Sequence, residues 1–242
     1  MTRQRDIERE RPRPDQRQLE MLRDIGTFRM IDTQHLAQYR YGGSDRAMRA
    51  DVAQLAGMVE TIELMERKAD RQLEIVVLTK EGRRMLNLPR FTVRTREAFH
   101  DSQVYGAYRE AATRIEAKGG TVARVVMDDE MKSMKARETN KKYPGRKENS
   151  PLTKPEKERI ARELNLKLMP VVKRGQTELK IHIPDVRIEY EDKNGKPQLL
   201  DLEVTTSSYR AGSKQAKAAA GFALYSGSGA GSPVWDSHSI WR

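Results

Sequence analysis

The sequence contains no cysteine, only four histidines and few aromatic residues, which make up 6% of its 242 positions. The absence of cysteine excludes disulfides, thiolate metal sites and cysteine nucleophiles, and it agrees with a cytoplasmic location. The scattered histidines do not favour a histidine-ligated zinc site. No apolar run approaches the roughly 18 residues of a membrane-spanning helix, and the polar first residues do not resemble a secretory signal. We therefore expect a cytoplasmic protein without a membrane partner.

Positive charge is what the sequence has in excess, with 46 basic and 35 acidic residues and a net charge of +11. Residues 132–180 carry 15 basic and 6 acidic side chains, a net charge of +9, and residues 1–18 contribute +2. The remaining segments are balanced. A local excess of one sign favours contact with nucleic acid, and double-stranded DNA is the expected partner. The alternative is a solvated or disordered insert.

Residues 16–89 predict three helices, a β-hairpin and a closing helix. The first helix begins at Gln16 and ends near Gly26, and the second is capped by Asp32 or Thr33. The third helix is capped by Ser44 or Asp45. Two strands, 62–67 and 73–78, flank a polar turn, and Thr79 caps the last helix. This order is that of a winged helix.

A winged helix places its third helix in a DNA major groove and its hairpin beside a phosphate backbone. The third helix offers Arg46, Arg49 and Gln54 as DNA-binding candidates, and the hairpin offers Lys68 and Arg71. Residues 19–89 have 11 basic and 11 acidic side chains, so protein contact or dimerisation by the same unit is the alternative.

The middle of the chain predicts a helix over 102–118, a strand over 121–127 and a short polar helix from Asp128. The basic segment that follows predicts a loop around 140–145 and an amphipathic helix over 154–168. Its candidates for contact with the DNA backbone are Lys141, Lys142, Arg146 and Lys147.

Acidic residues distinguish the region after the basic segment. A strand over 179–190 is interrupted by Pro184-Asp185, and a hairpin turn leads to a strand over 199–205. Asp201 and Glu203 project from one face of that strand because they are two residues apart. Asp185 and Glu203 on paired strands could hold Mg²⁺, which prefers oxygen ligands and could activate water. The alternative is that these acids form salt bridges with Arg187 or with Lys214 and Lys217 of a helix predicted over 212–225.

Pro184-Asp185, a hairpin and Asp201-Leu202-Glu203 before a helix resemble the PD-(D/E)XK nuclease-like fold. Together with the winged helix, they resemble the replication-relaxation family of plasmid and mobile-element proteins. The resemblance covers residues 16–131 and 180–226. The matching stretches are residues 18–26, His100-Asp101, residues 183–185, residues 202–205, Lys217 and Tyr225.

The resemblance implies DNA binding in plasmid replication, relaxation or transfer. It also implies magnesium-dependent cleavage, with Asp185 and Glu203 as metal ligands and catalytic residues. The sequence departs from the pattern at Thr205, where a lysine is expected. Lys214 or Lys217 could supply that ammonium as a catalytic residue. Glu110 or Glu116 could supply an acid from the first helix of the nuclease-like unit.

We therefore expect an α/β (α+β) protein with a mixed sheet and flanking helices in its second domain. Its parts are an arm 1–15, a winged helix 16–89, a nuclease-like domain 96–226 with a basic insert 132–180, and a tail 227–242. The leading hypothesis is a DNA-binding protein of a plasmid, phage or other mobile element. The alternatives are a magnesium-dependent DNA endonuclease and a transcriptional regulator with a ligand-sensing or dimerising second domain. Further partners considered are a second copy of the chain and replication or transfer proteins.

Overall fold

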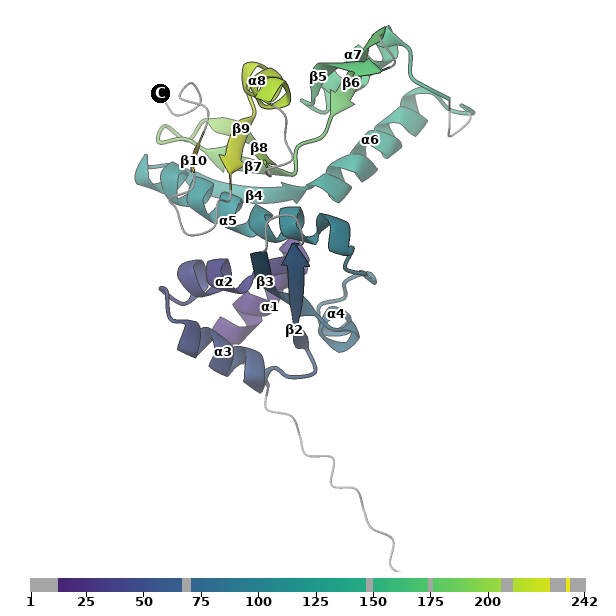
Figure 1. Cartoon of the computed structure of the whole chain (residues 1–242). Coiled ribbons are helices and arrows are strands. Elements are labelled where there is room, and N and C mark those ends of the chain that lie inside the picture. Colours follow the sequence, from purple (N-terminus) through teal and green to yellow (C-terminus); the bar gives the residue numbers. More distant parts are fainter. Residues whose placement is uncertain are drawn as a thin grey trace, which may run out of the picture. The chain divides into compact units, whose positions relative to one another are not determined.

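The computed structural model describes residues 13–66, 71–146, 150–173, 176–205, 211–226 and 234–235 (Figure 1). Lys68, Lys147 and most of the predicted arm and tail lie outside these ranges. The chain is mixed α/β and divides into two compact units, Met1–Val93 and Arg94–Arg242. None of the helices in the described ranges is both long and apolar enough to span a membrane.

In the first unit, helices are interspersed along the chain with the strands of a small antiparallel sheet, whose order is β1-β3-β2. Asp32, Ser44 and Thr79 each accept a backbone N–H at a helix start, so these three predicted caps are confirmed. The elements are α1 (Gln16–Phe28), β1 (Met30–Asp32), α2 (Thr33–Arg40), α3 (Asp45–Gln54), β2 (Val59–Glu66), β3 (Arg71–Leu78) and α4 (Lys80–Met85).

Two details of the first unit differ from the sequence prediction. Helix α1 continues past Gly26 to Phe28. Gly26 allows a close approach, because a Cβ there would lie 2.7 Å from Leu88 Cδ1. The three-residue strand β1 was not predicted, and all of its residues are buried beside the central strand β3. Such a short strand has no recognisable period in the sequence.

The second unit contains a five-stranded sheet of order β10-β9-β8-β7-β4 and a separate two-stranded sheet. Strands β8 and β9 are parallel, and the other neighbours in the large sheet are antiparallel. Helices α5 and α8 lie on opposite sides of the large sheet (Figure 1). The elements are α5 (Thr95–Ala117), β4 (Thr121–Met127), α6 (Asp128–Lys142), α7 (Lys154–Glu163), β5 (Lys167–Lys173), β6 (Gln176–His182), β7 (Val186–Glu191), β8 (Pro197–Val204), α8 (Ala211–Ala219), β9 (Ala223–Ser226) and β10 (Val234–Trp235).

The basic segment forms regular structure and packs against the sheet. Helix α6 runs through residues 140–142, so the predicted loop there is wrong. Three acidic residues in its first turn and two lysines in its last turn match the helix dipole, which favours the longer helix. Val126, Met131, Ala161 and Leu166 form a common core between α6, α7 and the sheet.

Three other predicted boundaries also differ. Helix α5 begins at Thr95, seven residues before the predicted start at residue 102. Helix α7 ends at Glu163, because Asn165 takes a left-handed backbone conformation with a φ of 49° and β5 follows. Helix α8 ends at Ala219, and residues 223–226 form β9 beside β8. The break at Pro184-Asp185 separates β6 from β7, as the sequence predicts.

Candidate functional site

Asp185 and Glu203 meet where β7 begins and β8 ends. The register pairs Val186 with Leu202, so the two acidic residues lie at adjacent positions just beyond this pair. The backbone N–H of Asp185 donates to Leu202 O at 3.1 Å, and Val204 N–H donates to Asp185 Oδ2 at 2.8 Å. The two carboxylates are therefore fixed by the sheet itself.

The carboxylate of Glu203 is fully paired inside the protein. Its side chain is 2% exposed, Lys217 Nζ of α8 donates to Oε2, and His182 Nε2 contacts Oε1. Burial of a carboxylate is costly unless it is paired, and Lys217, itself 7% exposed, provides the counter-charge. Lys214 is half-buried and makes no ion pair within the described ranges. The structure therefore brings Lys217, and not Lys214, to Glu203.

Thr205 occupies the position at which the nuclease motif would have a lysine. Its backbone N–H donates to Tyr225 O at 2.7 Å, and its hydroxyl donates to the same oxygen at 3.2 Å. The residue is 4% exposed. A lysine at this buried position would lose the hydroxyl hydrogen bond to Tyr225 O. The ammonium that contacts Glu203 belongs to Lys217 of α8.

Asp185 contacts His100, which is not among the site residues predicted from the sequence. His100 Nε2 lies 3.0 Å from Asp185 Oδ2, and His100 Nδ1 lies 2.9 Å from Asp101 Oδ1. Burial lowers the pKa of His100, but the hydrogen bonds and charges of the two carboxylates outweigh it and raise the pKa to about 10. His100 is thus a cation at neutral pH.

The first helix of this unit therefore contributes a histidine to Asp185. Glu110 instead accepts a hydrogen bond from Arg114 at 2.6 Å, and Glu116 is exposed. The adjacent His100-Asp101 pair is the one local signal in the sequence for this contact. Its partner Asp185 is 85 residues away, which periodicity cannot reveal.

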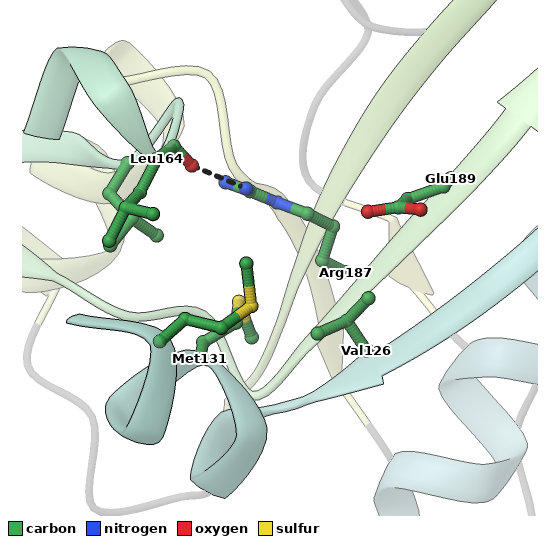
Figure 2. Close-up of a pocket in the computed structure, with 7 residues that line it drawn as sticks. Val126, Met131, Leu164, Arg187 and Glu189 are labelled. Atoms are coloured by element: carbon green, nitrogen blue, oxygen red, sulfur yellow. Dashed lines mark hydrogen bonds between the residues drawn. The ribbon is translucent and has the colours of Figure 1, made fainter. Parts of the chain in front are cut away.

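Asp201 forms a separate structural ion pair on the same face of β8. Arg187 Nε donates to Asp201 Oδ1 at 2.6 Å. Arg187 Nη1 donates to Leu164 O at 2.9 Å, the bond that is dashed in Figure 2. The pocket beside Arg187, lined by Val126, Met131 and Leu164 among others, has a volume of about 10 Å³. That is room for about one water molecule, so this region serves packing.

The donor set does not fit a resident magnesium ion. Both oxygens of Glu203 contact cationic or histidine side chains, and Asp185 Oδ2 contacts His100 and a backbone N–H. Mg²⁺ requires several oxygen ligands in octahedral geometry. The parts of the chain that the structure describes contain no cluster of three or more histidine, aspartate or glutamate side chains suited to a metal. A metal would first have to displace His100, His182 and Lys217.

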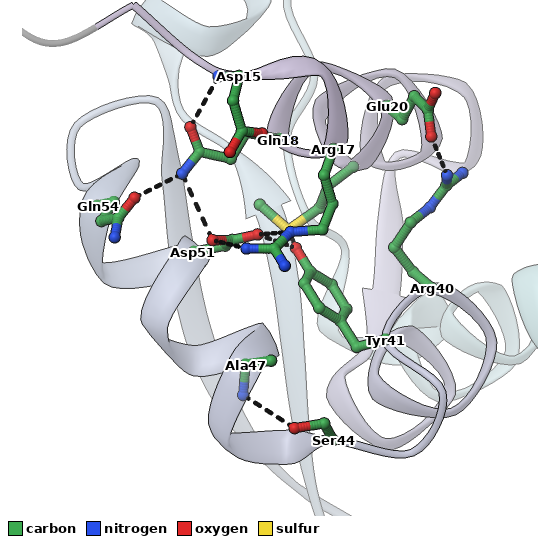
Figure 3. A network of polar contacts seen from close by, with 11 residues as sticks. Asp15, Arg17, Gln18, Glu20, Arg40, Tyr41, Ser44, Ala47, Asp51 and Gln54 are labelled. Carbon is green, nitrogen blue, oxygen red and sulfur yellow. Dashed lines mark hydrogen bonds and ion pairs between the residues drawn. The ribbon is translucent and has the colours of Figure 1, made fainter.

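The DNA-binding candidates on α3 are largely engaged within the first unit. Arg49 donates to both oxygens of Glu74 at 3.1 and 2.8 Å and to Asp45 at 2.8 Å. Gln54 accepts a hydrogen bond from Gln18 Nε2 at 2.7 Å (Figure 3). Arg46 is exposed and makes no ion pair within the described ranges. The side chain of Arg71, like Lys68, lies outside the described part of the chain.

A buried acid organises this network. Asp51 is 1% exposed and accepts hydrogen bonds from Arg17 at 2.8 Å and from the Tyr41 hydroxyl at 2.9 Å (Figure 3). Burial and the hydrogen bond to Asp51 raise the pKa of Tyr41. These contacts hold α3 against α1. The residue at their centre is an acid, and not a side chain that would contact DNA.

The candidates in the basic segment fall into two groups. Lys142 pairs with Glu163 at 3.0 Å, and Arg146 pairs with Glu156 at 2.6 Å. Lys141 is exposed without an ion pair to a described residue, and Lys147 lies outside the described ranges. Neutralised cations add little attraction for another anion, so Lys141 is the member of this set that remains available.

Four further cations of α6 and α7, namely Arg137, Lys154, Arg159 and Arg162, are also exposed without an ion pair to a described residue, and the sequence pattern did not identify them. We define the α6–α7 basic surface as Arg137, Lys141, Arg159 and Arg162, which are exposed and make no ion pair within the described ranges. Lys141 and Arg159 both lower the pKa of Glu163, so the two helices bring their charges close together. The i,i+4 and i,i+3 spacings were the available sequence signal.

No protein-family model, curated protein or solved structure matches this chain. The function must therefore be argued from the geometry and charge of the site.

Proposed function

We propose that this chain binds double-stranded DNA and contacts the phosphate backbone through the α6–α7 basic surface. The observation that carries the proposal is the set of four exposed cations that make no ion pair with a described residue, although Lys141 and Arg159 act electrostatically on Glu163. Cations of this kind bind phosphates by releasing the counterions condensed on DNA, which is favourable and independent of sequence. They set the position of the protein on the duplex.

The distribution of charged side chains supports contact with the DNA backbone by the second unit more strongly than by the first. Glu63 of β2 lies directly opposite Glu74 of β3, so the hairpin carries two adjacent acids. Arg49 neutralises Glu74, which leaves Arg46 as the exposed cation of α3 without an ion pair in the described ranges. The order of helices and strands supports a winged helix, in which Arg46 would face the major groove.

The biological setting of the proposal comes from the motif resemblance alone. Pro184-Asp185, Glu203 and the preceding helix–hairpin unit are the features that resemble those of plasmid and mobile-element proteins. On that basis we propose a role in replication, relaxation or transfer of a plasmid, phage or other mobile element.

A magnesium-dependent endonuclease is the second candidate, and one observation favours it. Three segments of the second unit bring Asp185, Glu203 and Lys217 to one place. If the basic segment is left out, the elements of this unit follow the order α5-β4-β7-β8-α8-β9 along the chain. The pairing of both carboxylates and the 1% exposure of Glu203 count against cleavage. We therefore rank binding above cleavage.

The test of binding compares two variants with the same change in net charge. One replaces Arg137, Lys141, Arg159 and Arg162 by glutamine. The control replaces four exposed cations that are already ion-paired, namely Arg84, Arg94, Arg124 and Lys132. DNA affinity is measured as a function of salt concentration. We expect the slope of log affinity against log salt to fall by about 3 to 4 in the first variant and by less than about 1 in the control.

The test of cleavage uses supercoiled plasmid with Mg²⁺. We expect no nicking by the wild type. Nicking that Asp185→Asn and Glu203→Gln both abolish would make the endonuclease the correct function.

A further inference from the structure

Strands β5 and β6 form a two-stranded antiparallel ribbon that is separate from the five-stranded sheet of the second unit. We call it the β5–β6 ribbon, and both of its strands contact α7 (Figure 1). Leu168 and Ile181 pack against the core that includes Ala161 of α7, and Met169 packs against Phe222. The second unit therefore holds the inner end of the ribbon in place on both faces.

The outer part of the ribbon presents a row of exposed side chains. Gln176, Glu178 and Lys180 of β6 are all exposed, and they lie on one face because successive members are two residues apart. Val171 lies directly opposite Glu178 on the same face and is 36% exposed. The row from Gln176 to Lys180 is about 13 Å long. It combines an amide, a carboxylate, an ammonium and an apolar group.

The ribbon adjoins the α6–α7 basic surface and has the same sign of charge. Residues 167–182 have four basic side chains and one acidic side chain, a net charge of +3. Ala161, in the core against which the ribbon packs, is adjacent in sequence to Arg162 and two residues from Arg159. A DNA duplex bound at the α6–α7 basic surface would therefore have the ribbon beside it.

The exposed row matches the chemistry of the DNA major groove. This groove is about 12 Å wide and admits a two-stranded β-ribbon. In it, glutamine pairs with adenine, lysine with guanine, a carboxylate with the amino group of cytosine, and an apolar side chain with the methyl group of thymine. A surface that bound only phosphates would gain nothing from Glu178, because phosphate oxygens repel a carboxylate. The carboxylate is favourable where it accepts a hydrogen bond from a base.

We propose that the β5–β6 ribbon enters the major groove and reads base edges through Gln176, Glu178 and Lys180. The inference rests on the proposed function, to which it adds a sequence preference. Phosphate contacts position a protein on DNA, whereas base contacts distinguish one sequence from another. A row of about 13 Å corresponds to about four base pairs at about 3.4 Å each. The ribbon therefore predicts a preferred sequence of this length that includes a C·G pair read by Glu178.

The test selects bound DNA from a library of randomised duplexes, with the full chain as the binding protein. The ribbon variant, whose net charge is unchanged, carries Gln176→Ala, Glu178→Ala and Lys180→Ala. The control variant makes matching charge changes at exposed positions of the β7–β8 hairpin, namely Glu191→Ala, Lys193→Ala and Asn194→Ala. We expect the wild type and the control to bind the selected sequence at least about tenfold more tightly than a scrambled duplex. The ribbon variant should bind both duplexes equally.

Two further measurements separate base contacts from phosphate contacts. Glu178→Gln keeps the size of the side chain, and it should lower the preference for C·G at one position about tenfold while the other preferred positions remain. The ribbon variant should keep the wild-type slope of log affinity against log salt. A slope lower by about 1 would place Lys180 on a phosphate and overturn its role in reading bases.

The possible failures of this inference and of the proposed function differ. A selected sequence that the ribbon variant prefers as strongly as the wild type would overturn the inference, and loss of that preference in Arg46→Ala would assign the reading to α3. DNA binding by the wild type without any sequence preference would also overturn it and leave the proposed function standing. A wild-type protein that binds no duplex would refute the proposed function, and the reading role with it.

Discussion

Lys217→Met tests the buried ion pair at the centre of the candidate site. The substitution keeps most of the side-chain volume and removes the ammonium that faces Glu203. Glu203 has a side chain that is 2% exposed, so water cannot replace the lost partner. His182 remains in contact with its other oxygen.

The magnitude follows from the burial of both partners. Breaking a buried pair by removal of one member costs about 3 to 5 kcal/mol, and the contact with His182 places the expected loss at about 3 kcal/mol. For a unit of this size, that loss lowers the midpoint of thermal unfolding by roughly 6 to 12 °C. Replacing both members with apolar residues should recover much of the loss.

Urea unfolding of Lys217→Met, Glu203→Leu and the double variant measures the coupling between the two residues. Lys214→Met is the matched control, since Lys214 lies one turn earlier on α8 and is half-buried. We expect the control to lose less than about 1 kcal/mol. Equal losses for Lys217→Met and Lys214→Met, or a coupling energy of zero, would refute the reasoning.

Three further predictions concern the first unit. Asp51→Leu should lower the free energy of unfolding by about 3 kcal/mol, because Arg17, Tyr41 and Gln18 lose their common hydrogen-bond acceptor. Urea unfolding measures this loss, and a value below about 1 kcal/mol would contradict the prediction. Gly82→Ala should cost about 2 kcal/mol in the same assay, since its Cβ would lie 2.1 Å from Met58 O, and wild-type stability would show that the backbone accommodates the methyl group. Hydrogen bonds from Arg49 lower the pKa of Glu74, so the stabilisation that they provide is present above pH 4.5 and is lost as the pH falls. In an NMR titration, Arg49→Met should return the pKa of Glu74 towards its ordinary value. An unchanged pKa would show that Arg49 does not cause the shift.

Local signals predicted much of the fold. The caps at Asp32, Ser44 and Thr79 and the strand at 121–127 depend on residues within a few positions of one another. The extent of α6 and the start of β5 depend on packing against the large sheet, through residues such as Met131 and Leu166. Tertiary contacts of this kind override local propensity.

The candidate site was predictable only in part. The motif spacing indicated Asp185 and Glu203, but the choice between Lys214 and Lys217 depends on how α8 packs beside β8. Arg49, Lys142 and Arg146 carry charge in the sequence, yet each is paired with a carboxylate of another segment. Net charge per segment cannot separate paired cations from available ones.

The salt dependence of DNA affinity tests the proposed function most directly. We expect the fourfold glutamine variant of the α6–α7 basic surface to have a shallower slope than the variant that lacks four paired cations. Between 50 and 200 mM salt, the affinity advantage of the wild type over the surface variant should shrink about 100-fold. The same slope in both variants would contradict DNA binding through this surface.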